Sequence, residues 1–138
     1  MRILVTCCAI FLAAALIASA GNAAEPLLSS PVTLQSPFHV NVLYTMMRAS
    51  DFMANTVSTR GGYVYTYSAD LSRQWGEIPA RDTQVWTQPP GTPTVGLMYL
   101  RAWEVTGAEA FLEYAEMAAD ALTAGQHPAG GWHYLIDF

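Results

Sequence analysis

The stretch Gly61-Gly62-Tyr63-Val64-Tyr65 returns later in the chain as Gly130-Gly131-Trp132-His133-Tyr134, an offset of 69 residues from position 61 to position 130. Each copy follows the predicted end of a helix. Paired glycines can end a helix at positive φ and let the chain turn back tightly, and the aromatic ring that follows can cover the helix end. A helix followed by Gly-Gly-aromatic, present twice, predicts stacked helical hairpins.

Two helices are predicted between the copies. Thr92 is expected to cap the first helix, Pro93–Thr106, and Gly107 to end it. Apolar residues lie nearly all round this helix, which indicates that neighbours cover it on several sides. The second helix, Ala108–Ala124, has an apolar face and an opposite acidic face, which indicates one solvated side. The acidic face consists of Glu109, Glu113, Glu116 and Asp120.

The chain before these helices divides into three segments. His39–Ser58 has apolar residues on one face and is predicted to be a helix. Tyr63–Tyr67 alternates aromatic residues and is predicted to be a short strand or an extended segment with one aromatic face. Ala69–Thr92 has no clear periodicity and is predicted to be a long loop, which in a compact domain is usually functional or disordered. Trp75 and Trp86 lie in this loop and favour an ordered one.

The first 24 residues have the three parts of a secretory signal peptide. Arg2 supplies the positive charge, residues 3–18 form the apolar core, and small residues that follow offer cleavage sites. Both cysteines, Cys7 and Cys8, lie in this segment, so the mature chain is expected to have no disulfide and no cysteine metal site. We therefore predict a secreted or periplasmic protein without a membrane anchor, in which residues 25–38 form an extended leader.

The composition limits the partners and the chemistry. The 138 residues include six arginines, no lysine and eleven acids, for a formal net charge of −5. A negative net charge argues against a general phosphate-binding surface for nucleic acid. The sequence also contains no Gly-x-Ser-x-Gly, no His-Glu-x-x-His and no phosphate-loop motif, which argues against the hydrolases, metalloproteases and nucleotide-binding proteins that use them.

Several motifs in residues 60–138 are similar to those of a known family: Gln88–Gly96, Tyr99–Ala102, Val105–Gly107, Ala118–Leu122 and Gly130–Trp132. Together they resemble the first hairpins of α/α-toroid polysaccharide lyases, closest to the family 10 pectate lyases. The fold class implied is mainly α: helical hairpins of an incomplete α/α toroid, with short extended segments after the Gly-Gly turns. Because a closed toroid needs more helices, residues 39–138 are expected to be a partial toroid domain, the N-terminal part of a longer protein. The alternative is a small three-helix domain that dimerises.

The resemblance implies an exported lyase that cleaves an acidic polysaccharide, pectate first, by β-elimination. It also implies calcium as the cofactor, a cation that prefers several carboxylate or carbonyl oxygens. No catalytic residue of the family is carried over, and the 138 residues alone are expected to be inactive. The alternatives are a toroid glycoside hydrolase, in which paired carboxylates would act, and a non-catalytic helical interaction module.

Substrate binding is predicted for aromatic and charged residues of the long loop and of the second Gly-Gly copy. Indole rings can stack on sugar rings, and guanidinium groups can bind carboxylates in a fork. The alternative is that the tryptophans pack in the core and the charges form surface ion pairs. No set of metal ligands with suitable spacing is present. The predicted substrate-binding residues are Arg81, Trp86, Trp75, Asp82, His133 and Asp137.

Overall fold

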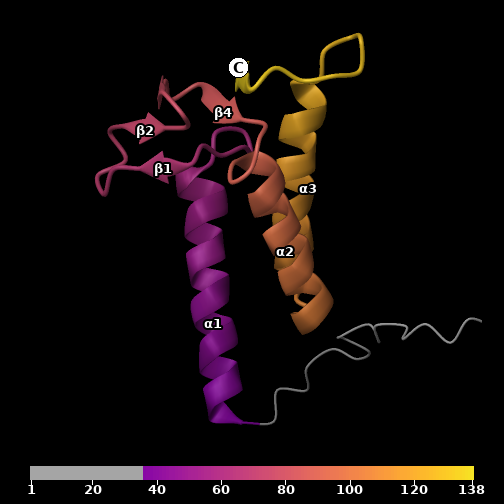
Figure 1. The fold of residues 1–138 in the computed structure, drawn as a ribbon. Coiled ribbons are helices and arrows are strands. Elements are labelled where there is room, and N and C mark those ends of the chain that lie inside the picture. Colours follow the sequence, from indigo (N-terminus) through magenta and orange to yellow (C-terminus); the bar gives the residue numbers. More distant parts are fainter. Residues whose placement is uncertain (1–35) are drawn as a thin grey trace, which may run out of the picture.

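Residues 36–138 are described by a computed structural model in which three α-helices lie roughly side by side and short strands gather at one end of them (Figure 1). The helices are α1 (Pro37–Phe52), α2 (Thr92–Thr106) and α3 (Glu109–Ala124). The signal peptide predicted over residues 1–24, and the leader as far as residue 35, lie outside the described residues.

The first helix begins two residues before the predicted start, inside the predicted leader. Ser36 caps it, because its hydroxyl accepts a hydrogen bond from the backbone N–H of His39 at 3.4 Å, and Pro37 occupies the first turn. One π-helical turn, η1 (Met53–Val57), continues α1 almost to the predicted end at Ser58. None of the helices in residues 36–138 is both long and apolar enough to cross a membrane.

Helices α2 and α3 form the predicted hairpin. Gly107 ends α2 in the left-handed conformation, with φ of 67°, and its N–H bonds to the carbonyl of Trp103 at 2.7 Å. The predicted cap is wrong by one residue, because Gly91 holds the capping position and Thr92 is the first helical residue. The Thr92 hydroxyl instead accepts a hydrogen bond from the backbone N–H of Tyr63 at 2.9 Å.

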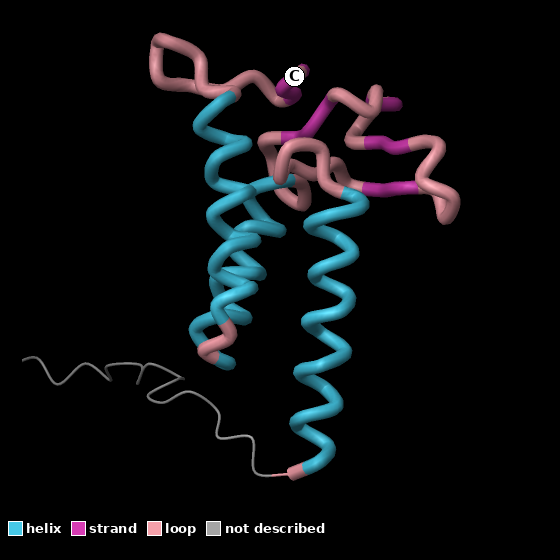
Figure 2. The backbone as a smooth tube through the Cα atoms, turned by 180° about the vertical axis from the view of Figure 1, so that it is seen from behind, coloured by secondary structure: helices cyan, strands magenta, loops and turns pink. Residues whose placement is uncertain are grey.

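The predicted loop Ala69–Thr92 contains three of the five strands, and a fourth lies in Tyr63–Tyr67, which is predicted to be extended. One antiparallel sheet consists of β1 (Thr66–Tyr67), β2 (Gln74–Trp75) and β3 (Pro79–Ala80). The other two, β4 (Gln84–Trp86) and β5 (Leu135–Asp137), form a second antiparallel pair in which Val85 lies opposite Ile136. Figure 2 shows both sheets at the same end of the helices.

The α/α-toroid fold class is therefore wrong for residues 36–138. About half of these residues are helical, in three helices, and two small antiparallel sheets complete the structure. Strands of two or three residues are too short to show a period-2 pattern, so the sequence of Ala69–Thr92 does not reveal β2, β3 and β4. The second Gly-Gly turn leads to β5, which pairs with β4, whereas a toroid would continue with another helix.

The core has two parts. Among the helices, Tyr63, Tyr99 and Phe111 are buried together, and the hydroxyls of Tyr63 and Tyr99 lie 3.1 Å apart. Under the strands, Val85 and Trp86 of β4 are buried. A Cβ added to Gly62 would lie 2.8 Å from the Val85 side chain, so this glycine lets the first Gly-Gly turn approach β4 closely. The strands are thus fixed to the ends of α1 and α2.

Candidate functional site

The two Gly-Gly turns place their aromatic residues in different surroundings. The first glycine of each turn has the predicted positive φ, 83° at Gly61 and 92° at Gly130. Tyr63 is 1% exposed and packs in the core, whereas Trp132 is 48% exposed. Trp132 still covers a helix end, because its indole N–H donates to the carbonyl of Leu122 in the last turn of α3 at 2.7 Å. The second turn therefore holds an indole at the surface in a fixed orientation.

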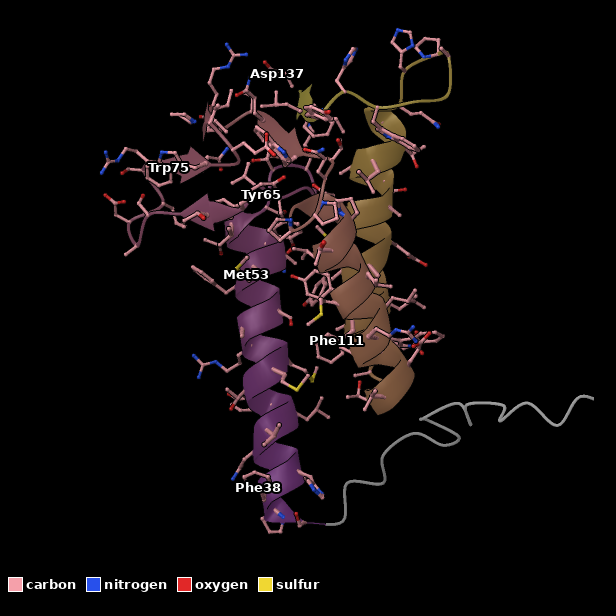
Figure 3. The ribbon with its side chains drawn as sticks, in the orientation of Figure 1. Phe38, Met53, Tyr65, Trp75, Phe111 and Asp137 are labelled. Carbon is pink, nitrogen blue, oxygen red and sulfur yellow. The ribbon has the colours of Figure 1, made fainter. Side chains whose placement is uncertain are left out.

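Arginine, histidine and tryptophan side chains come from the strands, turns and loop at one end of the molecule, where Figure 3 labels Trp75 and Asp137. They come from β2 and the turn before it, from the turn before β4 and from the loop between α3 and β5. All are exposed except Trp75, which is half-buried. We call them the strand-end surface, and its members are Arg73, Trp75, Arg81, His127, Trp132 and His133.

The charge distribution separates this end from the helices. Arg60, Arg73 and Arg81 lie among the strands and turns, where Arg60 stacks on the ring of Phe138 at 5.3 Å. Helices α2 and α3 hold five acids and one arginine, Arg101, which pairs with Glu104 at 2.6 Å. The strands and turns also hold four acids, of which Asp70 and Asp137 are engaged by neighbouring side chains, whereas Glu77 and Asp82 are exposed. Most of the negative net charge therefore lies on α2 and α3, and the strand end supplies the exposed arginines for an anionic ligand.

Arg81 and Asp137 meet across the β4–β5 sheet, 56 positions apart in sequence. The Asp137 carboxylate also accepts hydrogen bonds from the Thr83 hydroxyl at 2.7 Å and from the Gln84 amide at 3.1 Å. These bonds from Thr83 and Gln84, with Arg81, hold the pKa of Asp137 below its ordinary value. The side chain of Arg81 remains 69% exposed, so its other N–H groups face solvent.

Trp75 lies on β2 with a cation beside its ring. The guanidinium carbon of Arg73 is 5.5 Å from the centre of the indole, within the range of a cation–π interaction. The turn between β1 and β2 is held by Asp70, whose carboxylate accepts hydrogen bonds from the hydroxyls of Ser68 at 2.7 Å and Ser72 at 2.9 Å. These bonds lower the pKa of Asp70 to about 2. The turn thus fixes the position of Arg73 next to the indole.

The loop after α3 places two imidazoles near the exposed indole. The rings of His127 and His133 lie 5.9 Å apart, edge to face. The Nδ1 atom of His127 accepts the backbone N–H of Ala129 at 3.1 Å, and the Thr87 hydroxyl donates to the carbonyl of His133 at 2.6 Å. The loop encloses a shallow hollow of about 340 Å³. Its lining residues are His127, Ala129, Gly131, Trp132 and His133.

The structure brings together some of the predicted substrate-binding residues and separates others. Arg81 and Asp137 are in contact, and His133 and Trp75 lie on the same end of the molecule. Trp86 of β4 is 3% exposed, and the centre of its ring lies 5.4 Å from the centre of the Tyr65 ring. It therefore packs in the core under the strand.

Asp82 is exposed, and its backbone carbonyl accepts the hydroxyl of Thr59 at 2.7 Å. The six predicted substrate-binding residues did not include His127 and Trp132 of the strand-end surface. The repeated Gly-Gly-aromatic pattern was the signal for Trp132.

Calcium does not fit the side chains of residues 36–138. These residues hold no group of three or more histidine, aspartate or glutamate side chains that could surround a metal ion. The carboxylate of Asp137 is already engaged by three side chains, and that of Asp70 by two serines.

No family model matches this chain, and no curated protein or solved structure is significantly similar to it.

Proposed function

We propose that this chain is an exported protein that binds an acidic polysaccharide such as pectate on the strand-end surface. The observation that carries the proposal is that exposed arginines and oriented indoles lie at one end of the molecule, whereas six of the ten acids of residues 36–138 lie on the helices. Uronate polymers offer carboxylates to guanidinium groups and flat sugar faces to indoles. The surface is spread over two sheets and a loop, which favours an extended polymer over a single sugar.

Three features supply the contacts. Trp132 offers a half-exposed indole face whose orientation the bond to Leu122 fixes. Arg73 and Trp75 form a stacked pair, so one site offers a cation and an aromatic face together. Arg81 is held by Asp137 and still presents N–H groups to solvent.

Binding is tested by isothermal titration of the mature chain with polygalacturonate, and with neutral dextran for comparison. We expect polygalacturonate alone to bind, more weakly at high salt. Losing an indole face against a sugar costs on the order of 1.5 kcal/mol at about 25 cal/mol per Å², so Trp132→Ala should weaken binding by about tenfold.

The arginines are tested by Arg73→Met and Arg81→Met, each expected to weaken binding about two- to fivefold, the range for an exposed charge pair. The matched control is Arg48→Met, which removes an exposed arginine from α1. Equal binding of dextran and polygalacturonate, or an equal loss in all three arginine variants, would contradict the proposal.

Cleavage by β-elimination is the further part of the proposal, and the resemblance to pectate lyases supports it. Elimination leaves an unsaturated uronate that absorbs ultraviolet light. Because the 138 residues alone are expected to be inactive, we expect this absorbance to rise when a longer protein that contains them is incubated with polygalacturonate. Binding without any rise in absorbance would contradict the proposed lyase activity and would support glycan binding alone.

A second candidate function is a non-catalytic interaction module. The observation that favours it is a groove of about 350 Å³ between α1 and α2, at the end of the molecule away from the strands. Its walls are apolar apart from His39, Arg101 and Thr106. An uncovered apolar groove of this kind is typical of a protein interface.

A further inference from the structure

Helix α1 has an unusual combination of composition and surroundings. It holds two charged residues in its 16 positions, Arg48 and Asp51, and none of its residues is buried. Large apolar side chains along it are exposed, among them Phe38 at 71%, Val42 at 41% and Met46 at 40%. A helix that is apolar and uncovered favours burial against another surface.

The exposed residues form one stripe beside the α1–α2 groove. Phe38, Val42 and Met46 follow each other at intervals of four, so they lie on the same side of α1. Val42 and Met46 also line the groove, opposite Met98 and Val105 of α2. Helix α1 thus forms one wall of the groove, through Val42 and Met46, and these two residues together with Phe38 also form an exposed apolar ridge beside it.

We propose that a second copy of this chain occupies the groove, with the two α1 helices antiparallel across a twofold axis. In that arrangement the ridge of each copy enters the groove of the other, which is the self-complementarity that a twofold interface requires. Antiparallel packing also brings opposite helix dipoles together.

Charge permits this pairing in spite of the negative net charge of the chain. The lining of the groove includes no acid, and its two ionisable side chains are His39 and Arg101. Arg101 is already paired with Glu104, so it needs no anionic partner. The acids of α3 lie outside the lining of the groove. Two copies can therefore approach without bringing clusters of acids together.

The area available indicates a weak dimer. Phe38 exposes 71% of a side chain that can bury roughly 150–250 Å², so it offers roughly 110–180 Å². A whole aliphatic side chain can bury about 60–120 Å². The exposed fractions of Val42, Met46 and Met98 therefore add roughly 90–180 Å². Since interfaces are a little more than half apolar, this corresponds to roughly 350–600 Å² per copy. Stable dimers begin near about 600 Å² per copy, so we expect association that depends on concentration.

Sedimentation equilibrium of the mature chain between about 1 and about 100 μM tests the proposal. We expect the mean mass to rise from one chain toward two as the concentration increases. Val42→Glu and Met46→Glu, which place a charge in the interface, should stay monomeric. Val40→Glu makes the same change as Val42→Glu at a valine that is 50% exposed on the side of α1 away from Phe38 and Val42 and outside the lining of the groove, so it should dimerise as the wild type does.

The outcomes separate the possible occupants of the groove. A wild-type chain that stays monomeric up to about 100 μM overturns the proposal, and so does a dimer that neither glutamate variant weakens. A monomer that binds a medium-chain fatty acid in the groove also overturns it. Circular dichroism of each variant confirms that it is folded. Because two positions are substituted separately, failure of one variant to fold leaves the other to decide.

Discussion

Thr92 shows how a single side chain can join two parts of the structure. It is fully buried, and its hydroxyl accepts the N–H of Tyr63 at 2.9 Å and lies 3.2 Å from the carbonyl of the same residue. The backbone of Tyr63 belongs to the first Gly-Gly turn, and Thr92 begins α2. The hydroxyl therefore satisfies backbone groups that would otherwise be buried without a partner.

Replacing Thr92 with valine tests this role, because valine keeps the shape and removes the hydroxyl. The buried N–H of Tyr63 loses its acceptor, so we expect the free energy of unfolding to fall by about 1–3 kcal/mol. Urea denaturation measures the change. The control is Thr94→Val, two residues further along α2, where the side chain is half-buried. If both variants unfold at the same urea concentration, the hydroxyl of Thr92 has no special role.

Asp137 gives a prediction about pH. Its pKa in the folded chain is lowered by the bonds from Thr83, Gln84 and Arg81. The stability that this carboxylate contributes is present above its ordinary value of 3.8 and is lost as the pH falls through the lower, folded value. The difference in thermal stability between the wild type and Asp137→Asn should therefore be largest well above pH 3.8 and decline as the pH falls through the folded pKa of Asp137, which lies below 3.8.

The control for Asp137 is Asp82→Asn. The bond at Asp82 is made by its backbone carbonyl and survives this substitution. We expect the difference between the wild type and Asp82→Asn to change little with pH. A pH profile for Asp137→Asn that runs parallel to that of the wild type would show that the carboxylate contributes nothing to folding.

At the scale of the elements, the two Gly-Gly turns can be compared by substitution. A Cβ on Gly61 would overlap the backbone carbonyl of Met117 in α3, and φ there is also positive, at 83°. Gly130 has positive φ, at 92°, with open space around it, and Gly131 has open space without positive φ.

Substitution by alanine should therefore destabilise the chain in a fixed order. We expect about 1–2 kcal/mol at Gly130, where only the backbone conformation is unfavourable, and a larger loss at Gly61. Gly131→Ala should change stability by less than about 0.5 kcal/mol. Equal losses at Gly61 and Gly130 would mean that the contact with α3 is unimportant. Chemical denaturation of the three variants gives the order.

The elements with a strong local signal could be predicted from the sequence. Gly107 ends α2 as expected, and the acids of α3 lie on exposed positions. Strands β1 and β5 lie in segments predicted to be extended, whereas β2, β3 and β4 could not be predicted, because they depend on pairing between distant residues such as Val85 and Ile136. The same holds for the candidate site. Trp75 and Trp86 lie in one segment with similar sequence surroundings, and tertiary packing alone buries Trp86 against Tyr65.

At the scale of the whole molecule, the two proposed surfaces lie at opposite ends of α1. The strand-end surface follows the C-terminal end of α1, and the apolar stripe starts at Phe38 near its N-terminal end (Figure 1). A helix of 16 residues is about 24 Å long. In an antiparallel dimer the two strand-end surfaces therefore point away from each other, and each faces a different part of the solution.

A dimer of this kind should connect separate polysaccharide chains. Because its binding surfaces point in opposite directions, one polymer cannot easily reach both, and avidity on a single chain is limited by geometry. We expect the wild type, at concentrations where it dimerises, to increase the size of polygalacturonate particles in dynamic light scattering.

Val42→Glu should bind polygalacturonate with unchanged affinity per chain and leave the particle size unaltered, because it keeps the strand-end surface and loses the dimer. Trp132→Ala should still dimerise but should connect few polysaccharide chains, because it weakens the strand-end surface. If polygalacturonate particles grow equally with Val42→Glu and with the wild type, the polysaccharide chains are not connected by a dimer formed through α1.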